Sequence, residues 1–140
     1  LTFCAGSFSA GEHNDCVAMA KQFADRTHFV HLRSCYIFPN GNFTEASHLG
    51  GRGHLIELCR IFEKAEQEGK CNSGRRLPMR VDHGMTFTDE PGGVFDESNH
   101  GHNAGYTLLG RMFAMGQIQG VIATVDDELG IDYKQPGFYD

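Results

Sequence analysis

The chain has 140 residues and a formal net charge of −6 at pH 7. This length suits a single domain, and the negative charge argues against non-specific binding to nucleic acid or anionic lipid, since either partner would be repelled. No apolar stretch approaches the roughly 20 residues that a membrane-spanning helix needs. We therefore expect a water-soluble, cytoplasmic protein that binds neither nucleic acid nor membrane.

The first predicted unit is a strand, a loop and a helix. The apolar run at residues 1–5 predicts a strand already in progress at the first residue, and residues 6–13 are polar and glycine-containing. A helix is predicted over about 14–24, because Val17, Ala20 and Phe23 fall on one face. Either Asn14 or Asp15 suits its N-cap.

Two further units follow with the same order of elements. Residues 28–32 predict a strand, a long loop runs to the Gly-Gly-Arg-Gly stretch at 50–53, and Leu55, Leu58, Cys59 and Phe62 recur at helical spacing. The third strand is predicted at 77–81, followed by Asp82-His83-Gly84 and a loop to about residue 103. The last apolar segment predicts two helices that meet near Gly116 or Gly120.

Strands that alternate with helices predict parallel strands joined by right-handed crossovers. In such folds the chemistry lies at the C-terminal ends of the strands. The fold class expected is α/β, with about three strand-helix units of a (β/α)8 TIM barrel. Because a whole barrel needs about 250 residues, we expect the missing units to lie upstream and residues 1–140 to be the C-terminal portion of one catalytic domain.

Three side chains at or near the expected strand ends suit a divalent metal. Cys4, His31 and Asp82 supply a thiolate, an imidazole and a carboxylate. Each also has an ordinary alternative, since a single cysteine is often a small buried apolar group and a histidine in an apolar strand is often part of the core. Asp82 beside His83 is the sharper signal, because a buried carboxylate needs cationic compensation.

Five segments of the sequence resemble mannonate dehydratases, in the same order as in that family. They are Thr2-Phe3-Cys4-Ala5-Gly6-Ser7, His31-Leu32-Arg33, Ala46-Ser47-His48-Leu49, Pro78-Met79-Arg80-Val81-Asp82-His83-Gly84 and Gly105-Tyr106-Thr107-Leu108-Leu109-Gly110-Arg111. The resemblance implies a xylose-isomerase-like TIM barrel that dehydrates D-mannonate to 2-keto-3-deoxy-D-gluconate with Mn²⁺ or Fe²⁺, in glucuronate catabolism.

The resemblance also implies residue roles. Cys4, His31 and Asp82 match metal ligands of the family, whereas His83 and Tyr106 match its acid/base residues, with the acid and the base not distinguished. A further family ligand, a histidine on an earlier strand, has no counterpart in this sequence, so this chain by itself should hold metal poorly. Met85 follows Gly84 where family members often continue with histidine.

Three other residues are candidates for substrate binding. Arg33 and Arg80 suit the substrate carboxylate, because a guanidinium binds a carboxylate through two hydrogen bonds, and His48 is a further candidate. The ordinary alternative for both arginines is a salt bridge at the barrel rim.

Two other functions remain open at this point. One is a sugar isomerase or epimerase of the same barrel superfamily, which would act on a neutral sugar and need no guanidinium aimed at the site. The other is an inactive fragment without activity of its own. For the full-length parent we expect a homo-oligomer with a small sugar acid as its substrate.

Overall fold

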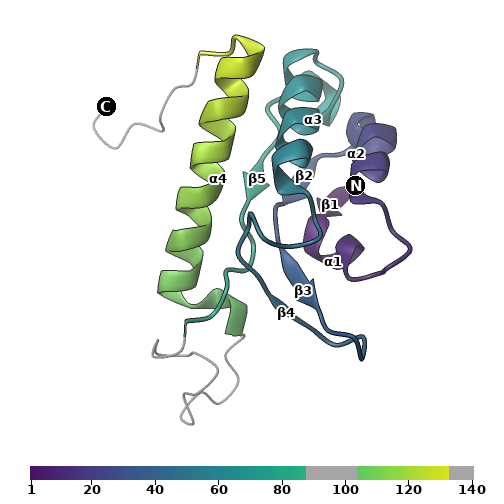
Figure 1. Cartoon of the computed structure of the whole chain (residues 1–140). Helices are drawn as coiled ribbons and strands as arrows, with labels where there is room; N and C mark the ends of the chain where they lie inside the picture. The colour runs from purple at the N-terminus through teal and green to yellow at the C-terminus, as the bar shows by residue number, and fades with distance from the viewer. Residues whose placement is uncertain (88–103, 133–140) are drawn as a thin grey trace.

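A small parallel sheet forms the centre of the fold. The structure is a computed structural model that describes residues 1–87 and 104–132. Its strands β1 (Thr2–Cys4), β2 (Phe29–His31) and β5 (Met79–Arg80) are parallel and ordered β1-β2-β5 (Figure 1). Cys4 pairs with His31, and His31 pairs with Arg80. The parallel pairing of these strands and the helical segments between them confirm the predicted α/β class and the predicted parallel strands.

Two of the predicted helices form where their apolar periodicity places them. α2 (Cys16–Phe23) begins after Asp15, whose carboxylate accepts hydrogen bonds from the amides of Val17 and Ala18. This carboxylate satisfies amide groups that have no partner within the helix. α3 (Leu55–Gln67) buries Leu55, Leu58, Cys59, Phe62 and Ala65 on one face. Three short 3-10 turns, η1 (Ala24–Arg26), η2 (Asn72–Gly74) and η3 (Ala104–Tyr106), lie between the longer elements.

The core lies between the sheet and these helices. Phe3, Val30, Leu58 and Phe62 have no exposed surface, and the rings of Phe3 and Phe62 pack edge to face with centroids 5.2 Å apart. Burying a side chain of this size stabilises a fold by about 1.5–3 kcal/mol. This packing fixes β1 against α3 and so positions the carboxyl end of β1.

Two segments predicted as loops contain regular structure. Residues 5–9 form a short helix, α1 (Ala5–Ser9), and the long loop after β2 contains an antiparallel hairpin of β3 (Cys35–Ile37) and β4 (Phe43–Glu45). Strands of three residues are too short for an apolar alternation to be recognised in sequence. Tertiary contacts stabilise these elements, which the local sequence pattern does not predict.

The last apolar segment is one helix, so the expectation of two helices is wrong. α4 (Leu108–Leu129) runs through both Gly116 and Gly120 and ends at Gly130, which has a left-handed φ of 67°. It lies beside α3 (Figure 1), and the buried Ala114, Ile118 and Val125 belong to the core. These contacts offset the roughly 1 kcal/mol by which each glycine weakens a helix.

α4 also differs from the expectation that no apolar stretch approaches the length of a membrane-spanning helix. With 22 residues, it is by length and composition long and apolar enough to cross a bilayer. Core helices of soluble proteins meet the same two criteria, and α4 contributes Ala114, Ile118 and Val125 to the core. The loop predicted to reach residue 103 lies outside the described residues from 88 onward.

Candidate active site

The structure brings together the three candidate metal ligands. Cys4 and His31 are the last residues of β1 and β2, and Asp82 lies two residues beyond β5. Their possible ligand atoms all lie within 4.8 Å of one another. Parallel register explains this closeness, because it places the ends of adjacent strands at one edge of the sheet. Of the described residues, these form the one such group of three.

Asp82 is buried and surrounded by donors. Its side chain is 7% exposed, Arg80 Nη2 lies 2.9 Å from Oδ1, and His31 Nδ1 lies 3.6 Å from Oδ2. The Tyr106 hydroxyl donates to Oδ1 at 3.0 Å. Asp82 also has a left-handed φ of 60°, which is uncommon for a residue with a side chain and frequent at functional sites. The carboxylate thus has the cationic compensation that its burial requires.

His83 and Tyr106 lie in contact, although 22 residues separate them in the sequence. Their ring centroids are 4.5 Å apart with an interplanar angle of 59°. The amide of Gly84 donates to the carbonyl of Gly105 at 2.8 Å and so ties the two segments together. A side chain at Gly105 would collide with the His83 ring, and one at Gly84 would collide with the backbone of Gly110. The glycines therefore permit the close approach of these segments.

Glu45 is a residue of this site that the sequence did not indicate. Its carboxylate accepts two hydrogen bonds from Arg33, from Nε at 3.0 Å and from Nη2 at 2.5 Å. Its Oε1 also lies 2.9 Å from Nδ1 of His83. Burial lowers the pKa of His83, while the charge of Glu45 acts in the opposite direction. Glu45 was missed because it lies on β4, in a hairpin that no sequence pattern predicted.

The remaining candidates have different surroundings. The buried ring of His48 lies with Nε2 3.0 Å from the carbonyl of Val81, and burial lowers its pKa. Arg80 Nη2 donates to the Tyr106 hydroxyl at 3.0 Å, and the Arg111 guanidinium lies 5.3 Å from the centre of the Tyr106 ring. His48 thus contacts the backbone of Val81, the residue before Asp82, whereas the guanidinium groups of Arg80 and Arg111 lie beside the Tyr106 side chain.

The fold and site define a chain of the α/β class with metal-ligand and acid/base residue types at the carboxyl ends of parallel strands. The profile of the family "D-mannonate dehydratase (UxuA)" matches residues 1–131. The chain is 37% identical over 131 residues to mannonate dehydratase 2 of Agrobacterium fabrum, covering 92% of this chain and 31% of that protein. It is also 37% identical over 128 residues to mannonate dehydratase of Saccharophagus degradans, covering 90% of this chain and 31% of that protein.

A solved structure has a similar fold. The crystal structure of mannonate dehydratase from Streptococcus suis serotype 2 superposes with a TM-score of 0.72 at 19% identity, over 100% of this chain and 37% of that one. The chain therefore belongs to the D-mannonate dehydratase family. It spans about a third of the length of the relatives that it matches.

Proposed function

We propose that the protein containing this chain dehydrates D-mannonate to 2-keto-3-deoxy-D-gluconate, as a metal-dependent hydro-lyase of glucuronate catabolism. The observation that carries the proposal is the group of Cys4, His31 and Asp82 adjoining His83 and Tyr106, in a chain of this family. These residue types supply metal ligands together with two groups that can transfer protons.

The donor set fits Mn²⁺ or Fe²⁺. Cys4, His31 and Asp82 offer sulfur, nitrogen and oxygen ligands, a mixture suited to a divalent first-row metal. When bound, the metal supplies electrostatic stabilisation of the negative charge that develops next to the substrate carboxylate. Ser7 donates to the Cys4 sulfur at 3.2 Å, and Arg80 and Tyr106 contact Asp82, so two of the three ligands have neighbours that orient them.

The arginines favour an acidic substrate over a neutral sugar. The Arg33 guanidinium already donates two hydrogen bonds to Glu45, so the nitrogens that would bind a substrate carboxylate are occupied within the chain. Arg80 and Arg111 place guanidinium groups at Tyr106, and the Arg80 side chain is 37% exposed. Arg80 is also engaged, with Nη2 2.9 Å from the Asp82 carboxylate and 3.0 Å from the Tyr106 hydroxyl, but it uses one nitrogen where Arg33 uses two. Its remaining N–H groups are the ones proposed to bind the substrate carboxylate. This observation favours a dehydratase of a sugar acid over the isomerase or epimerase alternative.

His83 and Tyr106 are the proposed acid/base pair. Dehydration needs a base to remove the proton beside the carboxylate and an acid to protonate the departing hydroxyl. Both side chains contact the Asp82 carboxylate, with His83 Nε2 at 3.8 Å from Oδ2 and the Tyr106 hydroxyl at 3.0 Å from Oδ1. Their positions therefore suit proton transfers at one substrate bound beside Asp82.

We further propose that residues 1–140 are the C-terminal portion of a (β/α)8 barrel. The parallel order β1-β2-β5 and the structural match over 37% of the Streptococcus suis chain support this proposal. On this view the 140-residue chain by itself is inactive, because the rest of the barrel and the further histidine ligand lie elsewhere in the protein. The full-length protein is proposed to be a homo-oligomer in the cytoplasm.

The test uses the full-length protein, purified without oxygen and loaded with Mn²⁺. We expect it to convert D-mannonate to the 2-keto-3-deoxy acid, and we expect Cys4→Ala to lose both bound metal and activity. Cys71→Ala is the matched control, because Cys71 is a buried cysteine outside the cluster. Metal content is measured by elemental analysis and product by its absorbance. Loaded enzyme that forms no product would contradict the dehydratase and make the isomerase reaction the next to test.

A further inference from the structure

His48 holds the peptide group that precedes a proposed metal ligand. The residue is 2% exposed, and its ring nitrogen Nε2 lies 3.0 Å from the carbonyl oxygen of Val81. A carbonyl oxygen can only accept a hydrogen bond, so the ring donates to Val81 through Nε2. Any further part of the protein can only add to this burial, so His48 is shielded from a substrate.

The Val81 carbonyl belongs to the peptide group that joins Val81 to Asp82. Because this group is planar, its orientation changes together with φ of Asp82. Asp82 has a left-handed φ of 60°, which is unfavourable for a residue with a side chain. A buried carbonyl that loses its hydrogen bond costs a free energy of the same order as this strain. The hydrogen bond from His48 is therefore large enough to keep Asp82 in its left-handed conformation.

The backbone conformation of Asp82 decides where its carboxylate lies. A change in φ rotates the Cα–Cβ bond about the bond from N to Cα, and the carboxylate moves with it. In the observed conformation a carboxylate oxygen lies within 4.8 Å of the ligand atoms of Cys4 and His31. Pairing with β2 ends at Arg80, so the sheet does not hold the peptide group before Asp82. His48 supplies the restraint that strand pairing does not.

Gln117 of α4 fixes the segment that carries His48. Its Oε1 accepts a hydrogen bond from the backbone amide of His48 at 3.0 Å, and its Nε2 donates to the Ser47 hydroxyl at 2.9 Å. Ser47 and His48 lie outside the helices and strands, so no ladder of hydrogen bonds holds them. The position of the His48 ring therefore depends on an amide side chain from the last helix.

We propose that His48 and Gln117 are positioning residues for the metal ligand Asp82. Gln117 holds the backbone of His48, and His48 holds the carbonyl of Val81, which keeps the Asp82 carboxylate beside Cys4 and His31. This proposal rests on the proposed function, and it gives His48 a role other than direct binding of substrate. Groups that orient a metal ligand without touching the metal change its affinity by about 10–100-fold when they are removed.

The alternative is that both residues only stabilise the fold. In the full-length protein, purified without oxygen, His48→Leu removes the donor, whereas His48→Gln keeps an N–H group near the position of Nε2. Thr27→Val is the matched control, because Thr27 is fully buried and its hydroxyl donates to the carbonyl of Phe23 at 2.9 Å, outside the metal-ligand group. Gln119→Ala, at an exposed position of α4, is the control for Gln117→Ala.

The first measurement is the Kd for Mn²⁺ without substrate, by competition with a chelator. We expect His48→Leu to raise Kd about 10–100-fold, Gln117→Ala to raise it about threefold or more, and His48→Gln to lie nearer the wild type. Thr27→Val should lower the urea midpoint of unfolding and leave Kd unchanged. A wild-type Kd in both His48→Leu and Gln117→Ala would overturn the proposal. Weakened binding in these variants, with no product from D-mannonate in the loaded wild type, would contradict the dehydratase function alone.

The second measurement is amide hydrogen exchange of the metal-free protein, which needs neither metal nor substrate. Loss of a local restraint speeds exchange locally, whereas a loss of global stability also speeds exchange in the core strands. We expect the Gly84 amide, which donates to Gly105, to exchange about 10-fold faster in His48→Leu than in Thr27→Val. The amide of Val30 in β2 should follow global stability in both. Equal acceleration at Gly84 and Val30 would overturn the proposal. If His48→Leu does not fold, Gln117→Ala decides by the same two measurements.

Discussion

The hydroxyl of Tyr106 donates a hydrogen bond of 3.0 Å to Oδ1 of Asp82, across 24 positions of the sequence. The same hydroxyl accepts from Arg80 Nη2 at 3.0 Å. The hydroxyl thus lies between a proposed metal ligand and the arginine proposed to bind the substrate carboxylate. This position suits a group that transfers a proton at a substrate bound beside Asp82.

Tyr106→Phe should therefore reduce activity far more than stability. We expect kcat for D-mannonate to fall by about 10²–10⁴, as is typical for loss of a general acid or a general base. The free energy of unfolding should fall by only about 0.5–1.5 kcal/mol, the net value of one hydrogen bond. Tyr36→Phe is the control, because Tyr36 is an exposed tyrosine on β3. A Tyr106→Phe enzyme with kcat within threefold of the wild type would remove Tyr106 from the acid/base pair.

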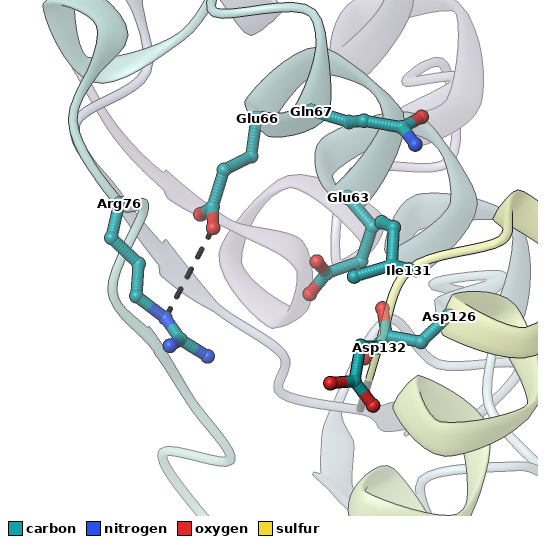
Figure 2. A pocket seen from close by; sticks show the side chains of 7 residues that line it. All are labelled: Glu63, Glu66, Gln67, Arg76, Asp126, Ile131 and Asp132. Atoms are coloured by element: carbon teal, nitrogen blue, oxygen red, sulfur yellow. Dashed lines mark ion pairs between the residues drawn. The ribbon is translucent and has the colours of Figure 1, made fainter. Parts of the chain in front are cut away.

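A second group of carboxylates lies away from the candidate active site, near the C-terminal ends of α3 and α4. Glu63 and Glu66 from α3 and Asp126 from α4 line a cavity of about 260 Å³ (Figure 2). Burial raises the pKa of Glu63 to about 7, with further contributions from the charges of Asp126 and Glu66. The Arg76 guanidinium opposes this shift, at 4.0 Å from Glu66.

This shift predicts a pH-dependent gain in stability for Glu63→Gln. Because the pKa of Glu63 is higher in the folded protein than the ordinary value of 4.5, stability falls as pH rises from about 4.5 to 7. The neutral glutamine avoids this loss. Thermal melting should show a higher Tm for the variant at pH 8, by about 4 °C for 1 kcal/mol, and little difference at pH 4. Glu57→Gln changes a glutamate of the same helix whose side chain is 42% exposed, and it should show no comparable gain at pH 8. An equal effect at both pH values would contradict the shifted pKa.

The apolar surface of α4 predicts self-association of the 140-residue chain. Leu108, Met112 and Phe113 are 72%, 54% and 43% exposed, and β1 and β5 are the edges of the described parallel sheet. Exposed apolar surface and open strand edges both promote association between chains. Sedimentation of the chain should show oligomers whose proportion rises with concentration.

Replacing two of these side chains by lysine should reduce that association. The double variant Leu108→Lys/Met112→Lys removes apolar surface, whereas Gln119→Lys adds a charge to an exposed position of the same helix and serves as the control. Since the proposed cause is apolar surface, the double variant should shift the distribution toward monomer and Gln119→Lys should not. A monodisperse wild-type chain would count against both the exposed face and the partial barrel.

Local sequence patterns predicted the elements that have strong periodicity or a clear cap. The spacing of Leu55, Leu58 and Phe62 predicted the position of α3, and Asp15, one of the two predicted cap residues, caps α2. The same patterns did not predict the hairpin that carries Glu45 or the continuity of α4 through Gly116. Three-residue strands contain too little periodicity to recognise, and glycine propensity was outweighed by packing against α3.

The sequence by itself determined the residue types of the site, because Cys4, His31 and Asp82 fall at or next to the ends of predicted strands and parallel strands bring such ends together. Only the tertiary structure decided which partners these residues have. Glu45 occupies Arg33 and faces His83, whereas Tyr106 contacts Asp82 and Arg80. These contacts join segments far apart in the chain, and no local pattern encodes them, because each depends on how separate elements pack against one another.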